Sequence, residues 1–398
     1  MALKSDYAMP EQHLVGLHEV FQHLLQGENS RCGENAKPRM GDWFTTAINS
    51  VSGNAIEAML YLAFRQKKKG KEIEPWIFDL IRSHLESSQE SPAIFALLGA
   101  HLGFFIHLFG TEVKTSPRLL FPSSRLAHQK AAIISHFRYD RATPTVIATL
   151  PELLSMGLKS LKLVLAEEKE GDANQDVRDF SWRLGIHIAI YYWNGGFPSE
   201  AEGESALDHY FEVATERDRA FLISKIASNF ERPAKGEPDK NLIGRVMRIW
   251  ERRYGQIIRR LKKGSRAGSS DYDGELGAFT NWLCCECFPF EWRFTHAMQA
   301  IEKLKKAPHS RRLLQTISDL GGQDDHLGAA LQILRAVLAK PSDGLRLSIQ
   351  FGELGPVIAR GLASGDRDTE HYAAESRDLL LKLGFFEFLE IGKGQAKH

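Results

Sequence analysis

The sequence predicts an all-α protein, an irregular α-solenoid of HEAT/TPR-like helical hairpins. Three observations lead to this fold class. Apolar residues recur at three- and four-residue steps along most of the chain, which places them on one face of a helix. Proline or glycine stands at nearly every boundary between these segments rather than inside them. Period-two alternation with β-branched enrichment is almost absent, and the lack of a strict repeat length favours an irregular stack over a consensus array.

The composition is that of a folded, soluble protein with almost no net charge. The chain has 398 residues, 43% apolar and 25% charged, which suits two or three ordinary domains or one elongated repeat array. The chain has 51 Lys and Arg residues and 50 Asp and Glu residues, so its net charge gives no indication of binding to nucleic acid or to a membrane surface. Partners must therefore be argued from local features.

The helices of the first half are predicted from apolar spacing and from proline in the first turn, where a missing N–H costs nothing. Residues 1–40 contain one helix and a loose connector. A helical-repeat subdomain follows at residues 41–166, and a polar linker at 167–176 is its expected seam. The helical segments predicted here are Leu14 to Leu24, Gly41 to Phe64, Pro75 to Leu85, Ala93 to Phe109, Arg125 to Phe137, and those that begin at Pro144 and Pro151 and end near Leu165.

Two more helical-repeat subdomains are predicted, at residues 177–264 and 275–392, with a Gly/Ser-rich linker between them. The stretch from Glu275 to Leu304 reads as two amphipathic helices separated by a sharp break at Pro289. A helix–break–helix unit is the repeating element of α-solenoids. The other helices are predicted at Trp182–Trp193, Ser205–Val213, Arg217–Phe230, Leu242–Lys263, Ser310–Leu320, Gly328–Leu338, Leu345–Leu362, Glu370–Leu383 and Phe385–Ile391.

Three of the four cysteines crowd together at Cys284, Cys285 and Cys287, with His296 and His309 downstream. Structural zinc sites typically pair two Cys-x-x-Cys elements, and only one half-site is present. On a helix, Cys284 and Cys287 would share a face while Cys285 points elsewhere. Zinc stays open as an alternative, but buried free cysteines explain the cluster better, and no metal is expected.

No catalytic or nucleotide-binding motif is visible. The sequence contains no His-Glu-x-x-His and no Gly-x-x-x-x-Gly-Lys-Ser/Thr. His101 and His107 lie six residues apart in an apolar segment and would not share a helix face. We therefore expect a non-enzymatic chain without a cofactor, with a hydrolase built from distant helices as the alternative.

The chain is expected in the cytoplasm. Four cysteines do not form a disulfide framework in a chain of this size, which fits a reducing compartment. No apolar run follows Lys4, so no signal peptide is visible. The longest apolar run, Ala93 to Phe109, is interrupted by two histidines and is too short and too polar for a membrane span, so no membrane partner is expected.

A basic stretch is the best local candidate for a ligand-facing surface. On a helix, four of its arginines (245, 248, 252 and 259) lie within one broad face. Such a stripe could bind a phosphate backbone or an acidic protein surface, and a solvated face balanced by its neighbours is the alternative. We expect charge reversal at Arg252 and Arg253 to leave the fold intact. The candidate partner-binding residues are Arg245, Arg248, Arg252, Arg253, Arg259, Arg260, Lys262 and Lys263, followed by Arg266.

Aromatic side chains are densest in the stretch from Glu275 to Leu304. Core packing between two helices explains them, and a partner pocket is the alternative. We expect Trp282 to lie in the core, where its replacement by alanine would destabilise the fold. The residues are Phe279, Trp282, Phe288, Phe290, Trp292 and Phe294.

Several short segments together carry a family resemblance. They are Ala47 to Met59, Leu98-Gly-Ala-His-Leu, Met247-Arg-Ile-Trp-Glu-Arg-Arg, Glu275-x-x-x-Phe279-x-x-Trp282 and Phe290-Glu-Trp292. Residues 40 to 390 resemble the helical-repeat C-terminal region of large bacterial anti-phage defence proteins, chiefly antiviral STAND NTPases and some sirtuin-linked defence proteins.

The resemblance implies a sensor or scaffold function. In that family the solenoid recognises a viral component, while separate modules hydrolyse nucleotide or destroy nucleic acid or cofactor. This sequence has no such module, so no catalytic residue can be carried over, and the chain is either a stand-alone subunit or a fragment. The expected partner is a protein, an effector subunit or a phage protein, and nucleic acid along residues 245–266 is the alternative.

Overall fold

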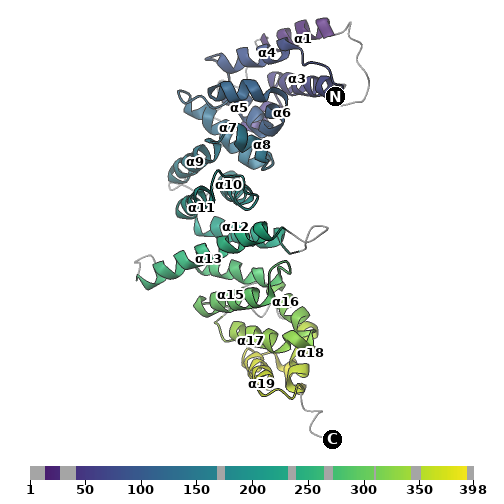
Figure 1. The fold of residues 1–398 in the computed structure, drawn as a ribbon, viewed down its shortest axis with the longest axis vertical. Helices are drawn as coiled ribbons and strands as arrows, with labels where there is room; N and C mark the ends of the chain where they lie inside the picture. Colours follow the sequence, from purple (N-terminus) through teal and green to yellow (C-terminus); the bar gives the residue numbers. More distant parts are fainter. Residues whose placement is uncertain are drawn as a thin grey trace. The chain divides into compact units, whose positions relative to one another are not determined.

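The computed structural model describes residues 14–26, 42–167, 175–231, 239–263, 272–308, 311–341 and 351–391. Over these residues the chain forms nineteen α-helices and no strand, so the predicted all-α class is confirmed (Figure 1). The stacking of hairpins into a solenoid stays a prediction. Residue contacts divide the chain into two compact units, Met1–Ala214 and Thr215–His398.

The helices of the first unit are short and closely spaced along the chain. They are α1 (Leu14–Gln26), α2 (Asp42–Ile48), α3 (Val51–Lys68), α4 (Pro75–Glu86), α5 (Pro92–Ala100), α6 (Leu102–Thr115), α7 (Leu126–Tyr139), α8 (Pro144–Thr149), α9 (Leu153–Glu167), α10 (Gln175–Trp193) and α11 (Glu200–Val213).

The second unit contains the longest described helix, α13. Its helices are α12 (Glu216–Asn229), α13 (Lys240–Lys262), α14 (Asp273–Thr280), α15 (Phe290–Lys303), α16 (Arg311–Gly321), α17 (Leu327–Leu338), α18 (Phe351–Leu362) and α19 (Arg367–Lys382). Short 3-10 helices lie at η4 (Pro117–Leu119), η7 (Asn281–Cys284), η8 (Asp324–His326) and η10 (Phe386–Glu390).

Helix α5 forms the centre of the first unit. Every residue from Ala93 to Ala100 is buried, and the helix packs between α2 and α7. The approach to α7 depends on Gly99, because a Cβ atom there would lie 2.1 Å from the carbonyl oxygen of Ala132. Only glycine allows two helix backbones to come this close.

The segment from Ala93 to Phe109, predicted as one helix, is two helices that meet at 96°. The bend lies at His101, and the second helix begins where the backbone N–H of Gly103 donates to Oδ2 of Asp140, at 2.6 Å. Asp140 ends α7, so a residue distant in sequence caps the first turn of α6. Among the described residues no single helix is long and apolar enough to cross a membrane. The two helices of this bent pair reach the required length and hydropathy only when they are taken together.

The boundary between the units differs from the predicted seam at residues 167–176. Helix α10 follows that linker and packs against α7, α9 and α11, all in the first unit. The boundary at Ala214 therefore falls inside the segment predicted as residues 177–264.

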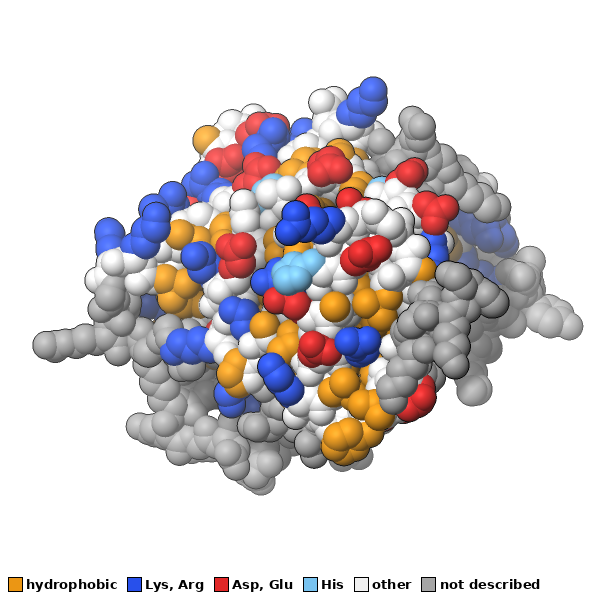
Figure 2. Space-filling view, turned by 90° about the horizontal axis from the view of Figure 1, so that it is seen from below, with side chains coloured by type: hydrophobic (Ala, Val, Ile, Leu, Met, Phe, Trp, Pro, Cys, Tyr) orange, Lys and Arg blue, Asp and Glu red, His pale blue; other side chains and the backbone are white. Residues whose placement is uncertain are grey.

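The second unit has a continuous apolar core around α17. This helix packs against α16, α18 and α19, and Ile333, Leu334 and Val337 are fully buried. On the face shown in Figure 2, Lys and Arg side chains lie among Asp and Glu, and neither sign dominates. The mixed surface agrees with the near-zero net charge of the sequence.

Candidate functional site

A buried carboxylate anchors the basic helix α13. Glu275, on α14, has no exposed surface and accepts from Arg253 on α13, with 2.7 Å from Nε to Oε2 and 2.9 Å from Nη2 to Oε1. Nε of Arg219, on α12, donates to Oε1 of the same carboxylate at 2.6 Å. One side chain therefore ties three helices together through charge-assisted hydrogen bonds, which are stronger than neutral ones.

The two guanidinium groups around Glu275 have further polar neighbours. Nη1 of Arg253 donates to Oε1 of Gln256 at 3.1 Å. The carboxyl group of Glu216 lies near Arg219 and Glu275, and burial, followed by the charge of Glu275, raises its pKa. A buried ion cluster of this kind persists only when its members are mutually paired and hydrogen-bonded.

Large aromatic side chains hold α13 against α14 and α15. The ring of Trp250 stacks on Tyr254 with centroids 4.6 Å apart and lies 4.9 Å from Phe279 and 4.3 Å from His296. The hydroxyl group of Tyr254 donates to the backbone carbonyl of Gln299 at 3.0 Å. These contacts fix which side of α13 faces the interior.

Trp282 lies in the core, as predicted from the sequence. Its side chain is 2% exposed, and Nε1 donates to the carbonyl oxygen of Ile223 at 3.1 Å. Phe279 and Phe288 are buried beside it. For these three aromatic residues, core packing is the correct interpretation.

The structure separates the predicted partner-binding residues into three groups. Arg252, Arg259, Lys262 and Lys263 are exposed. Arg245, Arg248 and Arg260 are half-buried. Arg253 is only 1% exposed, and Arg266 lies outside the described residues.

Arg253 is therefore removed from the candidate surface, and charge reversal there is no longer expected to leave the fold intact. The physical reason is its partner Glu275, which makes the interior the favourable place for this cation. A signal for this was present in the sequence. Arg253 falls seven residues after Val246 and four before Ile257, on the buried stripe of the helix.

The cysteines lie in a turn instead of on one helix. The 3-10 helix η7 ends at Cys284, and Cys285 and Cys287 belong to the irregular segment before α15. This corrects the expectation that Cys284 and Cys287 share a helix face. Among the described residues no group of three or more His, Cys, Asp or Glu side chains could hold a metal ion, and His309 lies outside them.

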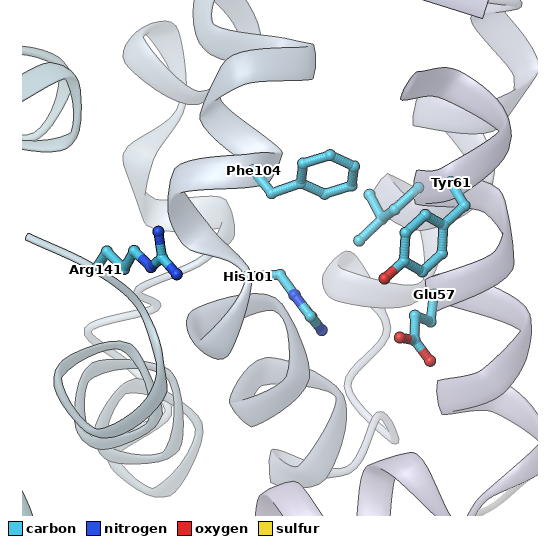
Figure 3. A pocket seen from close by; sticks show the side chains of 6 residues that line it. Glu57, Tyr61, His101, Phe104 and Arg141 are labelled. Atoms are coloured by element: carbon cyan, nitrogen blue, oxygen red, sulfur yellow. The ribbon is translucent and has the colours of Figure 1, made fainter. Parts of the chain in front are cut away.

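A pocket of about 590 Å³ in the first unit was missed by sequence reasoning. Its wall is formed by Leu60 and by the rings of Tyr61 and Phe104, whose centroids lie 6.0 Å apart. Glu57 and Arg141 lie on opposite sides of it, with His101 between them (Figure 3). An apolar wall with opposite charges at its two ends suits a small ligand that carries both charges.

Local patterns could not reveal this pocket, because its lining residues come from separate segments of the chain. Glu57 and Tyr61 are on α3, Phe104 is on α6, and Arg141 follows α7. Only His101, a polar residue inside an apolar run, marked the place in the sequence.

Two buried histidines form a second polar cluster in the first unit. His136 and His187 are 0% and 4% exposed, and their ring centroids lie 5.3 Å apart. Nδ1 of His136 lies 3.2 Å from Oδ2 of Asp140. Burial, and then the neighbouring His136, lower the pKa of His187 to about 3. This histidine is therefore neutral at physiological pH.

Comparison with known proteins finds no matching family model, no matching curated protein and no matching solved structure. The resemblance to defence-protein solenoids accordingly stays a prediction that rests on the segments quoted above.

Proposed function

We propose that this chain is a non-enzymatic binding module that contacts a protein partner through the cations on the solvent-facing side of α13 and at its C-terminal end. The supporting observation is the orientation of that helix. Arg253, Trp250 and Ile257 are buried, so the opposite side of α13 faces solvent. At 100° per residue, six of the predicted cations fall within an arc of about 100° on that side. We call this set the basic face; it consists of Arg245, Arg248, Arg252, Arg259, Lys262 and Lys263.

An acidic protein surface suits the basic face better than nucleic acid does. Nucleic-acid-binding domains commonly have an isoelectric point above about 9. This chain has an isoelectric point near 7.8 and almost equal numbers of positive and negative side chains. A single local stripe on an otherwise balanced surface is typical of a contact set by charge complementarity between two proteins.

The setting we propose is bacterial anti-phage defence, as the sequence resemblance implies. In that setting the partner is an effector subunit or a phage protein, and this chain acts as a sensor or scaffold. Support for the setting comes from the quoted segments alone.

Site-specific photo-crosslinking tests the proposal. A photoreactive residue placed at Arg259 in the full chain should capture a discrete protein in cells, and charge reversal at Lys262 and Lys263 should remove the adduct. The matched control places the same group at Arg82, an exposed arginine on α4 of the other unit. Equal adducts at both positions, or none at Arg259 in infected and uninfected cells, would contradict the proposal.

Nucleic acid is the second candidate, favoured by the density of cations on the basic face. If it is the ligand, the Arg259 adducts should be sensitive to nuclease. Purified chain should then bind duplex DNA with an affinity that falls steeply with salt, by a log–log slope of about −0.9 for each phosphate neutralised. Adducts at Arg259 that survive nuclease treatment, together with no binding of the purified chain to duplex DNA, would exclude this alternative.

A further inference from the structure

A pocket of about 550 Å³ lies within the second unit, where the end of α12, the turn before α15, and α15, α16 and η8 meet. Apart from Cys284 and Leu320, every residue that lines it is polar or charged. Its size is in the range of small-molecule sites. None of its lining residues belongs to α13, so the pocket is separate from the basic face.

Arg293, on α15, lines this pocket and is buried with part of its guanidinium unused. The residue is 9% exposed, and among the described residues it donates only from Nη1, to the carbonyl oxygen of Leu283 at 2.7 Å. Its Nε has no acceptor. In Arg253, Nε and Nη2 together bind the carboxylate of Glu275, whereas the same edge of Arg293 is unoccupied. A buried, charged donor without an acceptor is costly, so this edge favours an incoming oxyanion.

A second arginine at the pocket also has an unused donor. Nε of Arg312 is buried without an acceptor, although its Nη2 forms an ion pair with Glu231. Burial lowers the pKa of Arg312 and of Arg293, which means that the surrounding groups compensate these positive charges incompletely. The planar guanidinium group matches the oxygen spacing of carboxylate and phosphate groups.

Three carboxylates line the same pocket, and they determine what the rest of a ligand must carry. Glu231 is neutralised by Arg312, and Asp319 accepts from Nε2 of Gln315 at 3.0 Å. Glu286 is exposed. Ionised carboxylates only accept hydrogen bonds, so they favour a ligand with hydroxyl or amine donors beside its oxyanion.

We propose that this pocket binds a small organic acid, whose carboxylate or phosphate group pairs with the Nε–Nη2 edge of Arg293 and whose hydroxyl or amine groups donate to Asp319 and Glu286. The oxyanion supplies the acceptors that the buried guanidinium lacks. The donors supply what the carboxylates need. Binding of such a molecule is a function beyond the contact with a protein partner.

Calorimetric titration of the full chain tests this assignment with two probes that share their two hydroxyl groups and differ in the oxyanion. Glycerol 3-phosphate carries a phosphate group, and glycerate carries a carboxylate. Glycerol, which has no charge, is the control ligand. At least one of the two acids should bind saturably at a single site, and the stronger binder identifies the preferred oxyanion. Binding of neither acid, or equal binding of glycerol, would overturn the proposal.

Charge changes at Gln323 keep the test independent of folding, because this side chain lines the pocket and is exposed. Gln323→Glu should weaken binding of the acid and Gln323→Lys should strengthen it, each by roughly threefold or more. Gln89→Glu, at an exposed position of the first unit, is the matched control and should leave the affinity unchanged.

Replacement of Arg293 by lysine tests the pairing itself. The variant keeps the charge but loses the planar group, so the acid should bind at least about tenfold more weakly. If this variant does not fold, the two changes at Gln323 decide the question. An unchanged affinity in folded Arg293→Lys, or the same affinity in both Gln323 variants and the parent chain, would place the anion elsewhere and overturn the proposal.

Discussion

Glu275 and Arg253 are charged side chains inside an apolar interface, and each is buried because the other is present. Within the described residues, Glu275 receives hydrogen bonds from α12 and α13 at once. Loss of one member of such a pair leaves an uncompensated buried charge, which is far more costly than the loss of an exposed pair.

Replacement of Glu275 by glutamine should therefore lower the free energy of unfolding by about 3–5 kcal/mol. The variant keeps the size of the side chain but removes the charge that holds Arg219 and Arg253. Urea unfolding measures the change. Glu291→Gln, at an exposed position of α15, is the matched control and should stay within about 0.5 kcal/mol of the parent chain. Similar losses for both variants would show that the Glu275 cluster is not a stabilising anchor.

Replacement of Trp282 by alanine should cost about 3–5 kcal/mol, because it removes a large buried side chain and leaves a cavity. Phe221, on α12, is 42% exposed and serves as the aromatic control. Its replacement by alanine should change the melting temperature little. A melt of Trp282→Ala that coincides with that of the parent would place this side chain on a surface.

The buried His187 should make the free energy of unfolding depend on pH. Its folded pKa of about 3 lies below the ordinary 6.5, so the folded state holds fewer protons than the unfolded state between these values. Stability is complete above about pH 6.5 and falls as the pH drops, by up to about 1.4 kcal/mol per unit from this group. The charged or titratable neighbours that act on His187 are His136, Asp140 and Arg183.

The acid effect can be isolated with His187→Gln, which cannot titrate. Urea unfolding of both chains between pH 7 and pH 4 should show a shallower loss of stability in the variant. The parent chain supplies the reference at each pH. Parallel curves for the two chains would mean that His187 does not carry the effect.

At the scale of elements, most helix positions follow from the sequence, whereas the bend in the first unit does not. Helix α13 was predicted at Leu242–Lys263 and lies at Lys240–Lys262, because apolar spacing and flanking breaks are local signals. The first turn of α6 is capped by Asp140, which lies 37 residues downstream of its hydrogen-bond donor Gly103. A contact that distant leaves no trace in the local pattern.

Alanine should have opposite effects at two helical glycines, because only Gly99 lies where α5 packs closely on α7. Gly99→Ala should destabilise the fold by about 1–3 kcal/mol, because the added methyl group meets the backbone of Ala132. Gly16→Ala, on α1, meets nothing within 4 Å and should be neutral or stabilising by about 0.5–1 kcal/mol. Thermal melts of the two variants check the contrast. If Gly99→Ala is as stable as Gly16→Ala, the two helices are not in backbone contact.

At the scale of the whole molecule, the sequence revealed the charges of the candidate surface and the stripe on which Arg253 lies, but not the partner that allows this cation to be buried. The six cations of the basic face share an arc because helical geometry places them there. Arg253 lies on the apolar stripe of α13, and its partner Glu275 comes from a different helix, so the pairing of the two charges is visible only in the three-dimensional packing. The pocket around His101 likewise needed distant segments to come together.

The orientation of α13 is the central claim, because the proposed contact surface depends on it. Charge reversal at two consecutive residues tests it most directly. Arg252→Glu should leave the free energy of unfolding within about 0.5 kcal/mol of the parent chain, since this side chain is exposed. Arg253→Glu should lower it by at least about 3–5 kcal/mol, since it sets a carboxylate against buried Glu275. Urea unfolding measures both, and equal stabilities of the two variants would contradict the account.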